Sequence, residues 1–297
     1  MRIFLFSALL LNWLYSFDTL QYLNKLRVNA GSSKLYFDSA LAKAAKKHAI
    51  YLAKNREFGH FENPYKPFFF AKSPWQRITK AGFATKAVVE NISFYERSYK
   101  ESIDKIMATI YHRLAFLDTK IDSIGFAKYN RVYVYDMSNS KLARLCKKEY
   151  EYSSEVVENI CKNRRAIPKS IFNKALIDTK RRSNLLIIYP YPNQKNLPLR
   201  LQKESPAFSS KEYGLPISVC FNSFSRIKLT KLALYKNNKR VRGKIVTFRN
   251  DRNRKIPKNC FIFLPYKKLQ SSSLYKVFLR AKVGSKNIAK EWSFSTY

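Results

Sequence analysis

The chain has 297 residues, of which 57 are Lys or Arg and 20 are Asp or Glu, so its formal net charge is +37. Apolar residues make up 46% of the sequence and aromatic residues 15%, which excludes an intrinsically disordered chain. Only 7 Gly and 11 Pro are present, which excludes collagen-like and glycine-rich low-complexity proteins. At roughly 150 residues per domain, this length predicts two domains.

The high positive charge has two explanations that the sequence leaves open. It could reflect an anionic partner, such as nucleic acid, lipopolysaccharide or teichoic acid. It could also be compositional, because Lys, Asn, Ile, Phe and Tyr are abundant together, as AT-rich codons would produce. The basic residues are spread along the whole chain, which favours the compositional explanation. In either case the charge predicts adhesion to anionic surfaces.

The amino-terminal segment predicts export. Arg2 is followed by an apolar run from Ile3 to Tyr15, which is too short to span a bilayer but has the length of a signal-peptide core. We therefore expect a signal peptide over residues 1–16 with cleavage near Ser16, and an uncleaved anchor is the alternative. No later segment is apolar enough to cross a membrane. The protein is expected to be a monomer, either periplasmic or secreted.

Four cysteines support an oxidising compartment. They are Cys146, Cys161, Cys220 and Cys260, and they allow three pairings. We expect a local bridge between Cys146 and Cys161 and a strand-to-strand bridge between Cys220 and Cys260, each stabilising by roughly 2–4 kcal/mol. Four free thiols are the alternative. A structural zinc site is not expected, because no C-x-x-C spacing occurs.

The first part of the chain predicts helices followed by strands. Apolar residues at helical spacing predict four helices, over residues 18–28, 38–54, 74–81 and 98–112. Alternating apolar residues predict three strands, over residues 123–127, 131–137 and 184–189. Residues 140–182 are expected to form a helical or irregular insertion. The sequence thus predicts an α/β domain over residues 17–190, in which residues 184–190 supply the last strand.

After Pro190 the pattern changes to short strands separated by turns. Six strands are predicted, over residues 217–221, 231–235, 244–248, 261–264, 275–283 and 291–296. Short strands at this spacing predict an all-β sandwich of the immunoglobulin type over residues 191–297.

Three histidines, His48, His60 and His112, limit where chemistry can occur. The sequence contains no P-loop, no H-E-x-x-H and no G-x-S-x-G. His48 is expected on one face of a helix rather than in a site. His60 lies in the segment GHFENP and His112 in YHRLAFLD, while Glu90 lies in VENIS.

The order of these segments resembles the CAP superfamily, which comprises the cysteine-rich secretory, antigen 5 and pathogenesis-related proteins and is also called the SCP domain. The resemblance is to its bacterial branch and runs in order over residues 20–138. It is carried by LNKLRVNAG (23–31), LAKAAKKHAIYLAKN (41–55), GHFENP (59–64), SPWQRITKAGF (73–83), VENIS (89–93), YHRLAFLD (111–118) and DSIGFA (122–127). It implies an α-β-α sandwich with a cleft of two histidines and two acids. The segments GLPISVCF and EWSFST resemble bacterial Ig-like modules that follow such domains.

Carried over residue by residue, the resemblance implies a cleft formed by His60, Glu90 and His112. Some family members bind a divalent metal there, so zinc or another divalent cation is the implied cofactor. The family's second acid corresponds to Thr109 here, which predicts weak zinc binding or none. Glu62, two residues from His60, is the spare carboxylate of this binding site.

Three functions remain open from the sequence. The first is an exported cell-envelope or secreted protein that binds an anionic envelope polymer or a lipid in the cleft and is not an enzyme. The second is a metal-assisted hydrolase, peptidase-like or envelope-remodelling, that uses His60, Glu90 and His112 to activate water. The third, a nucleic-acid binder, rests on charge alone and is not expected. We expect the first, because no nucleophile motif is present.

Overall fold

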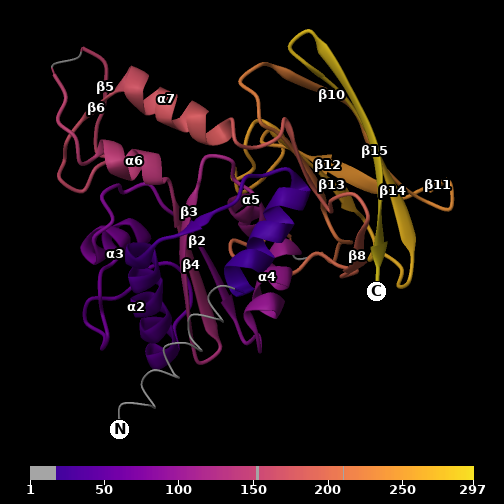
Figure 1. The fold of residues 1–297 in the computed structure, drawn as a ribbon. Coiled ribbons are helices and arrows are strands. Elements are labelled where there is room, and N and C mark those ends of the chain that lie inside the picture. The colour runs from indigo at the N-terminus through magenta and orange to yellow at the C-terminus, as the bar shows by residue number, and fades with distance from the viewer. Residues whose placement is uncertain (1–17, 152–153, 210) are drawn as a thin grey trace. The chain divides into compact units, whose positions relative to one another are not determined.

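Figure 1 shows the fold in a computed structural model, which describes residues 18–151, 154–209 and 211–297. The expected signal peptide lies outside the described residues. The chain divides into two compact units, each built from several stretches of sequence. The first unit comprises the described residues up to residue 28, residues 33–104 and residues 119–182. The second unit comprises residues 29–32, 105–118 and 183–297.

A four-stranded sheet forms the centre of the first unit. Its order is β1-β3-β4-β2, with β1 parallel to β3 and the other neighbours antiparallel. The strands are β1 (Tyr36–Phe37), β2 (Val89–Phe94), β3 (Ser123–Tyr129) and β4 (Val132–Ser138). The two strands predicted at 123–127 and 131–137 are confirmed as β3 and β4.

Three of the four predicted helices are confirmed, whereas the one predicted over residues 98–112 is wrong in its extent, because it ends at Met107 and a separate helix begins at Tyr111. Residues 18–30 are helical, and the labelled helices are α2 (Ser39–Asn55), α3 (Pro74–Ala81) and α4 (Tyr99–Met107). The Asp38 side chain caps α2 by accepting hydrogen bonds from the main-chain N–H groups of Ala40 and Leu41. A capping box of Ser73 and Gln76 begins α3.

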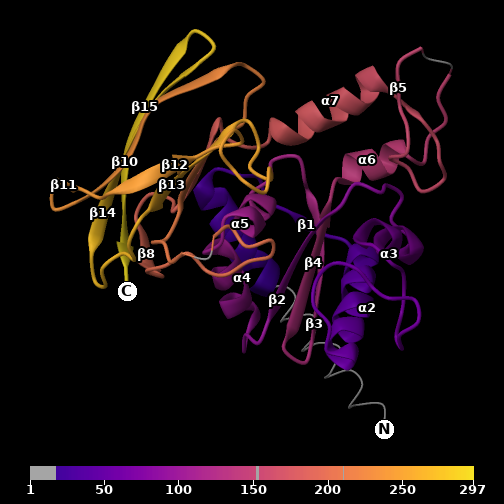
Figure 2. The ribbon, with the colours of Figure 1, turned by 180° about the vertical axis from the view of Figure 1, so that it is seen from behind.

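Helices cover both faces of the sheet (Figure 2). Successive residues of a strand point to opposite faces, so Val134 packs with Ala49 of α2 while the ring of Tyr133 lies 5.1 Å from that of Tyr99 on α4. Gly125 permits α2 to approach β3, because a Cβ there would lie 1.9 Å from the main-chain nitrogen of Ala42. The first unit is therefore an α/β domain in which α2 is held firmly against the sheet.

The expected insertion, residues 140–182, contains two helices and a short two-stranded sheet. These elements are α6 (Ser140–Leu145), β5 (Val156–Val157), β6 (Ile167–Pro168) and α7 (Lys169–Lys180). The predicted bridge between Cys146 and Cys161 is confirmed, and both cysteines pack with Ile167 in a small buried cluster.

Two sheets of mostly antiparallel strands make up most of the second unit. Their orders are β11-β10-β14-β15-β8 and β12-β13-β9-β7, and β15 with β8 is the parallel pair. The strands are β7 (Leu186–Tyr189), β8 (Gln194–Leu197), β9 (Ile217–Phe221), β10 (Ile227–Lys236), β11 (Lys239–Arg240), β12 (Gly243–Val246), β13 (Cys260–Pro265), β14 (Leu274–Val283) and β15 (Lys286–Thr296).

All six strands predicted after residue 215 are present, and the described residues beyond that point contain no helix. The predicted bridge between Cys220 and Cys260 joins opposed residues of β9 and β13. This region is all-β, and its assignment to the immunoglobulin type stays a prediction. In the described part of the chain no helix is both long and apolar enough to cross a membrane.

The strand that was expected to be the last one of the first domain is part of a sheet in the second unit. Residues 186–189 do form a strand, β7, but it pairs antiparallel with β9 and so belongs to the second unit. Ile187, Ile188 and Tyr189 are all buried, and a continuous apolar run of this kind does not indicate which sheet it will join. Residues 105–118, which carry His112, also join the second unit.

Candidate functional site

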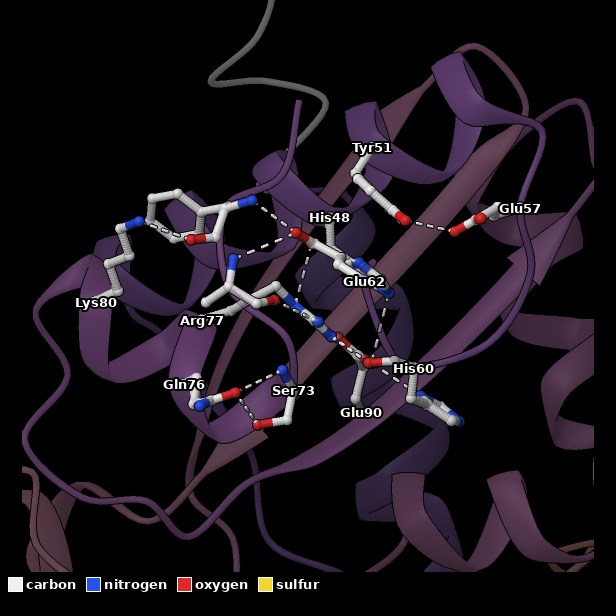
Figure 3. Close-up of polar contacts among 12 residues, drawn as sticks. His48, Tyr51, Glu57, His60, Glu62, Ser73, Gln76, Arg77, Lys80 and Glu90 are labelled. Carbon is white, nitrogen blue, oxygen red and sulfur yellow. Dashed lines mark hydrogen bonds and ion pairs between the residues drawn. The ribbon is translucent and has the colours of Figure 1, made fainter. Parts of the chain in front are cut away.

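A buried ionic network fills the region between α2, α3 and β2 in the first unit (Figure 3). His48, on α2, is completely buried, with Nδ1 2.9 Å from Glu62 Oε1 and Nε2 3.1 Å from the carbonyl oxygen of Gly59. The second oxygen of Glu62 accepts hydrogen bonds from the main-chain N–H groups of Phe70 (2.7 Å) and Ala71 (3.3 Å). Glu62, expected as a spare ligand, therefore fixes the loop between α2 and α3.

Arg77 is the cation of this network. It lies on α3 with no exposed surface, and its Nη2 atom donates to both oxygens of Glu90, at 3.0 and 2.8 Å. The same nitrogen donates to the carbonyl oxygen of His60 at 3.0 Å, and Nε lies 3.7 Å from Glu62 Oε1. One buried guanidinium thus links the two carboxylates and the main chain at His60.

His60 completes the network at its rim. Its Nδ1 atom lies 2.8 Å from Glu90 Oε1, so the expected hydrogen bond between Glu90 and one site histidine forms. The side chain of His60 is 36% exposed, whereas those of Glu90 and Arg77 are 1% and 0% exposed. His60 is therefore the member of this network through which a ligand could make contact.

The ionic state of the network follows from its neighbours. Burial alone would raise the pKa of Glu90, but the hydrogen bond from His60 and the charge of Arg77 outweigh burial and hold that pKa at about 2. Asp136, on β4, stands opposite Glu90 in the sheet and has no exposed surface. Burial, followed by the charge of Glu90, raises the pKa of Asp136 well above its ordinary value. An ionised Glu90 thus lies beside a carboxyl group whose neutral form is favoured.

His112 has a different carboxylate partner, which the sequence did not reveal. It lies at the start of α5 (Tyr111–Phe116) in the second unit, with Nδ1 3.1 Å from Glu204 Oε2. Glu204 also accepts hydrogen bonds from the main-chain N–H groups of Ile110 (2.9 Å) and Tyr111 (2.8 Å). The two partners are 92 residues apart in the sequence, so no local pattern could have joined them.

The residues next to His112 have structural roles. Arg113 is fully buried, donates to the carbonyl oxygens of Met107 and Pro216, both at 2.6 Å, and lies 4.6 Å from the ring of Tyr189. Burial lowers the pKa of Arg113 to about 10. Thr109, which stands at the family's second acidic position, donates its hydroxyl to a carbonyl of the preceding turn at 2.6 Å.

A shared cleft of His60, Glu90 and His112 stays a prediction, because the first unit carries His60 and Glu90 while the second carries His112. Among the described residues, no group of three or more His, Cys, Asp and Glu side chains is arranged to hold a metal ion. Both oxygens of Glu90 already accept hydrogen bonds from Arg77, so a guanidinium stands where a divalent cation would have to bind. The donor set of the first unit, as arranged, does not fit a metal.

Comparison with known proteins relates part of the chain, drawn from both units, to one family. No curated protein matches the chain. An extracellular SCP-domain protein of Bacillus anthracis is 16% identical, with a TM-score of 0.38, over 41% of this chain and 39% of its own length. An outer surface protein of Borrelia burgdorferi is 23% identical, with a TM-score of 0.35, over 43% of this chain and 90% of its own. Residues 20–133 match the cysteine-rich secretory protein family, and the chain therefore contains a CAP domain.

Proposed function

We propose that this protein is an exported, non-catalytic binding protein whose CAP domain engages an anionic ligand through His60. The observation that carries the proposal is the exposure of His60 at the rim of a network that is otherwise buried. The side chains of His48, Glu62, Arg77 and Glu90 are at most 1% exposed, against 36% for His60. The network therefore fixes the ring of His60 and leaves that ring as the accessible group.

His60 is the member of the network that could meet an anion. Arg77 lies between Glu62 and Glu90 and offsets part of the negative charge of these two buried carboxylates within the protein. The exposed imidazole of His60 is the group through which a carboxylate or phosphate of a ligand could be bound. The formal net charge of +37 would favour the approach of such a ligand.

Two features support export. Two disulfides form, and such bonds persist in oxidising compartments. The family that matches residues 20–133 is named for secreted proteins. Together with the expected signal peptide, these features support a periplasmic or secreted protein that meets anionic envelope polymers or lipids.

Hydrolysis is less well supported than binding. A general base needs a pKa near the working pH, and a Glu90 held at about 2 is too weak a base for that role at neutral pH. Its oxygens are also engaged by Arg77 and His60, so neither is placed to take a proton from water.

The test is equilibrium binding of poly(glycerol phosphate) to the exported full chain at low salt. We expect His60→Gln to weaken binding about tenfold, the loss of one charge-assisted contact. Lys228→Gln, which removes one exposed charge from β10, is the matched control and should change affinity less than twofold. Equal losses in both variants would mean nonspecific charge adhesion and would overturn the proposal. His112→Gln tests the predicted cleft, because it should weaken binding as much as His60→Gln if both histidines hold the ligand.

A further inference from the structure

The loop between α2 and α3, whose course Figure 1 shows, and the first turn of α3 carry a high density of exposed aromatic side chains. Among the described residues, sixteen large apolar side chains are exposed, and six of them fall between residues 58 and 75. These six, from 37% to 93% exposed, are Phe58, Phe61, Tyr65, Phe68, Phe69 and Trp75. We refer to residues 57–75 as the aromatic loop. Six exposed aromatic side chains within so short a segment indicate an interaction surface.

Several polar groups of the aromatic loop are hydrogen-bonded within the protein. The main-chain N–H of Glu62 donates to the carbonyl oxygen of Lys72 at 2.9 Å, and the Glu62 carboxylate accepts from the N–H of Phe70. The N–H of Asn63 donates to the hydroxyl of Tyr51 at 2.8 Å. An apolar environment penalises unpaired backbone groups, and these bonds reduce that penalty. These groups of the loop are thus satisfied within the protein, while six of its rings are exposed.

Lysines surround the aromatic rings. The ammonium of Lys80 lies 4.9 Å from the centre of the Phe70 ring, and that of Lys86 lies 5.1 Å from the Trp75 ring. Between residues 54 and 86 there are seven Lys or Arg and two acids. Of these acids, Glu57 pairs with Lys66, and Glu62 is buried in the network. The exposed charge of this region is therefore positive.

We propose that the aromatic loop binds the surface of an anionic lipid bilayer. Aromatic rings prefer the level of the lipid headgroups, where one edge is apolar and the other hydrated. Lysine stems lie along apolar surface while their ammonium groups reach the lipid phosphates. A soluble polyanion would satisfy the lysines but would leave the rings in water, so the combination favours a bilayer. This inference concerns the loop surface and does not depend on ligand binding at His60.

The first experiment measures co-sedimentation of the exported full chain with vesicles. We expect binding to phosphatidylcholine vesicles that contain 30% phosphatidylglycerol and little binding to pure phosphatidylcholine. Phe61→Ser/Tyr65→Ser should lower the partition coefficient about tenfold. Tyr266→Ser/Leu274→Ser removes side chains that are 48% and 64% exposed outside the loop, and it should bind like the wild type. Equal losses in the two double variants, or no loss in either, would overturn the proposal.

A second experiment measures the fluorescence emission of Trp75, which lies in the aromatic loop. Trp75 is 41% exposed and Trp292 is buried, while Trp13 lies in the expected signal peptide. Vesicles with anionic lipid should shift the emission to shorter wavelength, and brominated lipid should quench it. Trp75→Phe should abolish both effects. Co-sedimentation without any change at Trp75 would place the membrane contact elsewhere and would refute the proposal. His60→Gln leaves the aromatic rings in place and should lose far less vesicle binding than Phe61→Ser/Tyr65→Ser, which separates this proposal from the proposed function.

Discussion

The two units each contain a histidine bonded to a buried carboxylate, and the two pairs differ in what else holds the acid. His60 lies 2.8 Å from Glu90, and His112 lies 3.1 Å from Glu204. Glu90 is held by the guanidinium of Arg77, whereas Glu204 is held by main-chain N–H groups at the start of α5. Glu90 therefore belongs to a network of side chains, and Glu204 caps the start of a helix.

This difference shows that a histidine–carboxylate pair alone does not identify a functional site. A carboxylate at a helix amino terminus is stabilised by the local N–H groups and the helix dipole, so it has a structural reason to be there. A carboxylate on strand β2 that is bonded to a buried arginine has no such local reason. What else binds the carboxylate, a buried arginine or main-chain N–H groups, thus distinguishes the candidate site from a structural contact.

The largest expected effect comes from removing the cation of the network. Arg77→Met would leave Glu90 buried without its partner, and we expect the free energy of unfolding to fall by about 3–5 kcal/mol. Urea unfolding at pH 7, followed by circular dichroism, measures the loss. Arg97→Met, at an exposed arginine in the same unit, should have little effect. The double variant Arg77→Met/Glu90→Gln should be more stable than Arg77→Met alone, and a lower stability would contradict the pairing.

The next effect is a loss of stability in acid. Because the pKa of Glu90 falls from its ordinary 4.5 to about 2 on folding, its ionised form stabilises the native state above pH 4.5. That contribution, about 3 kcal/mol, is lost as the pH falls from 4.5 toward 2. Glu90→Gln lacks it, so the stability difference between wild type and Glu90→Gln should shrink over this range. Parallel stability curves between pH 7 and pH 2 would refute the role of Glu90.

Asp136 should behave in the opposite sense. Its pKa is raised on folding, so its native-state advantage exists at low pH and is lost as the pH rises above the ordinary value of 3.8. Asp136→Asn keeps a neutral side chain of similar shape at every pH. We expect it to match the wild type near pH 3 and to be more stable than the wild type at pH 7. Thermal unfolding at the two pH values measures this, and a destabilised variant at pH 7 would show that Asp136 is ionised.

Local patterns in the sequence were sufficient for much of the fold. Alternation predicted β3 and β4, and spacing predicted the six later strands. The expected pairing of the four cysteines, one local bridge and one between two strands, is confirmed. The order of the family segments was sufficient to bring Glu90 to a site histidine. Arg77 was visible in the segment PWQRITKAG, but its burial depends on α3 packing beside α2, which periodicity does not reveal.

Long-range partners could not be predicted in the same way. The apolar run of β7 is compatible with either sheet, and only its pairing with β9 decides its unit. Glu204 lies in a segment without regular secondary structure, so nothing near it indicates that it reaches the start of α5. Long-range contacts of this kind depend on the whole topology, and a single sequence carries no record of them.

The smallest effect tests the second histidine pair. Glu204→Ala removes a cap from α5, and we expect a loss of about 1 kcal/mol, because water can replace the carboxylate at a helix end. Glu212→Ala, at a carboxylate that is 74% exposed, is the control and should be nearly neutral. Urea unfolding measures both variants. A loss in Glu204→Ala as large as that in Arg77→Met would mean that Glu204 is the centre of a second ionic network. His112 would then be as strong a candidate for a functional site as His60, and the distinction drawn between the two pairs would fail.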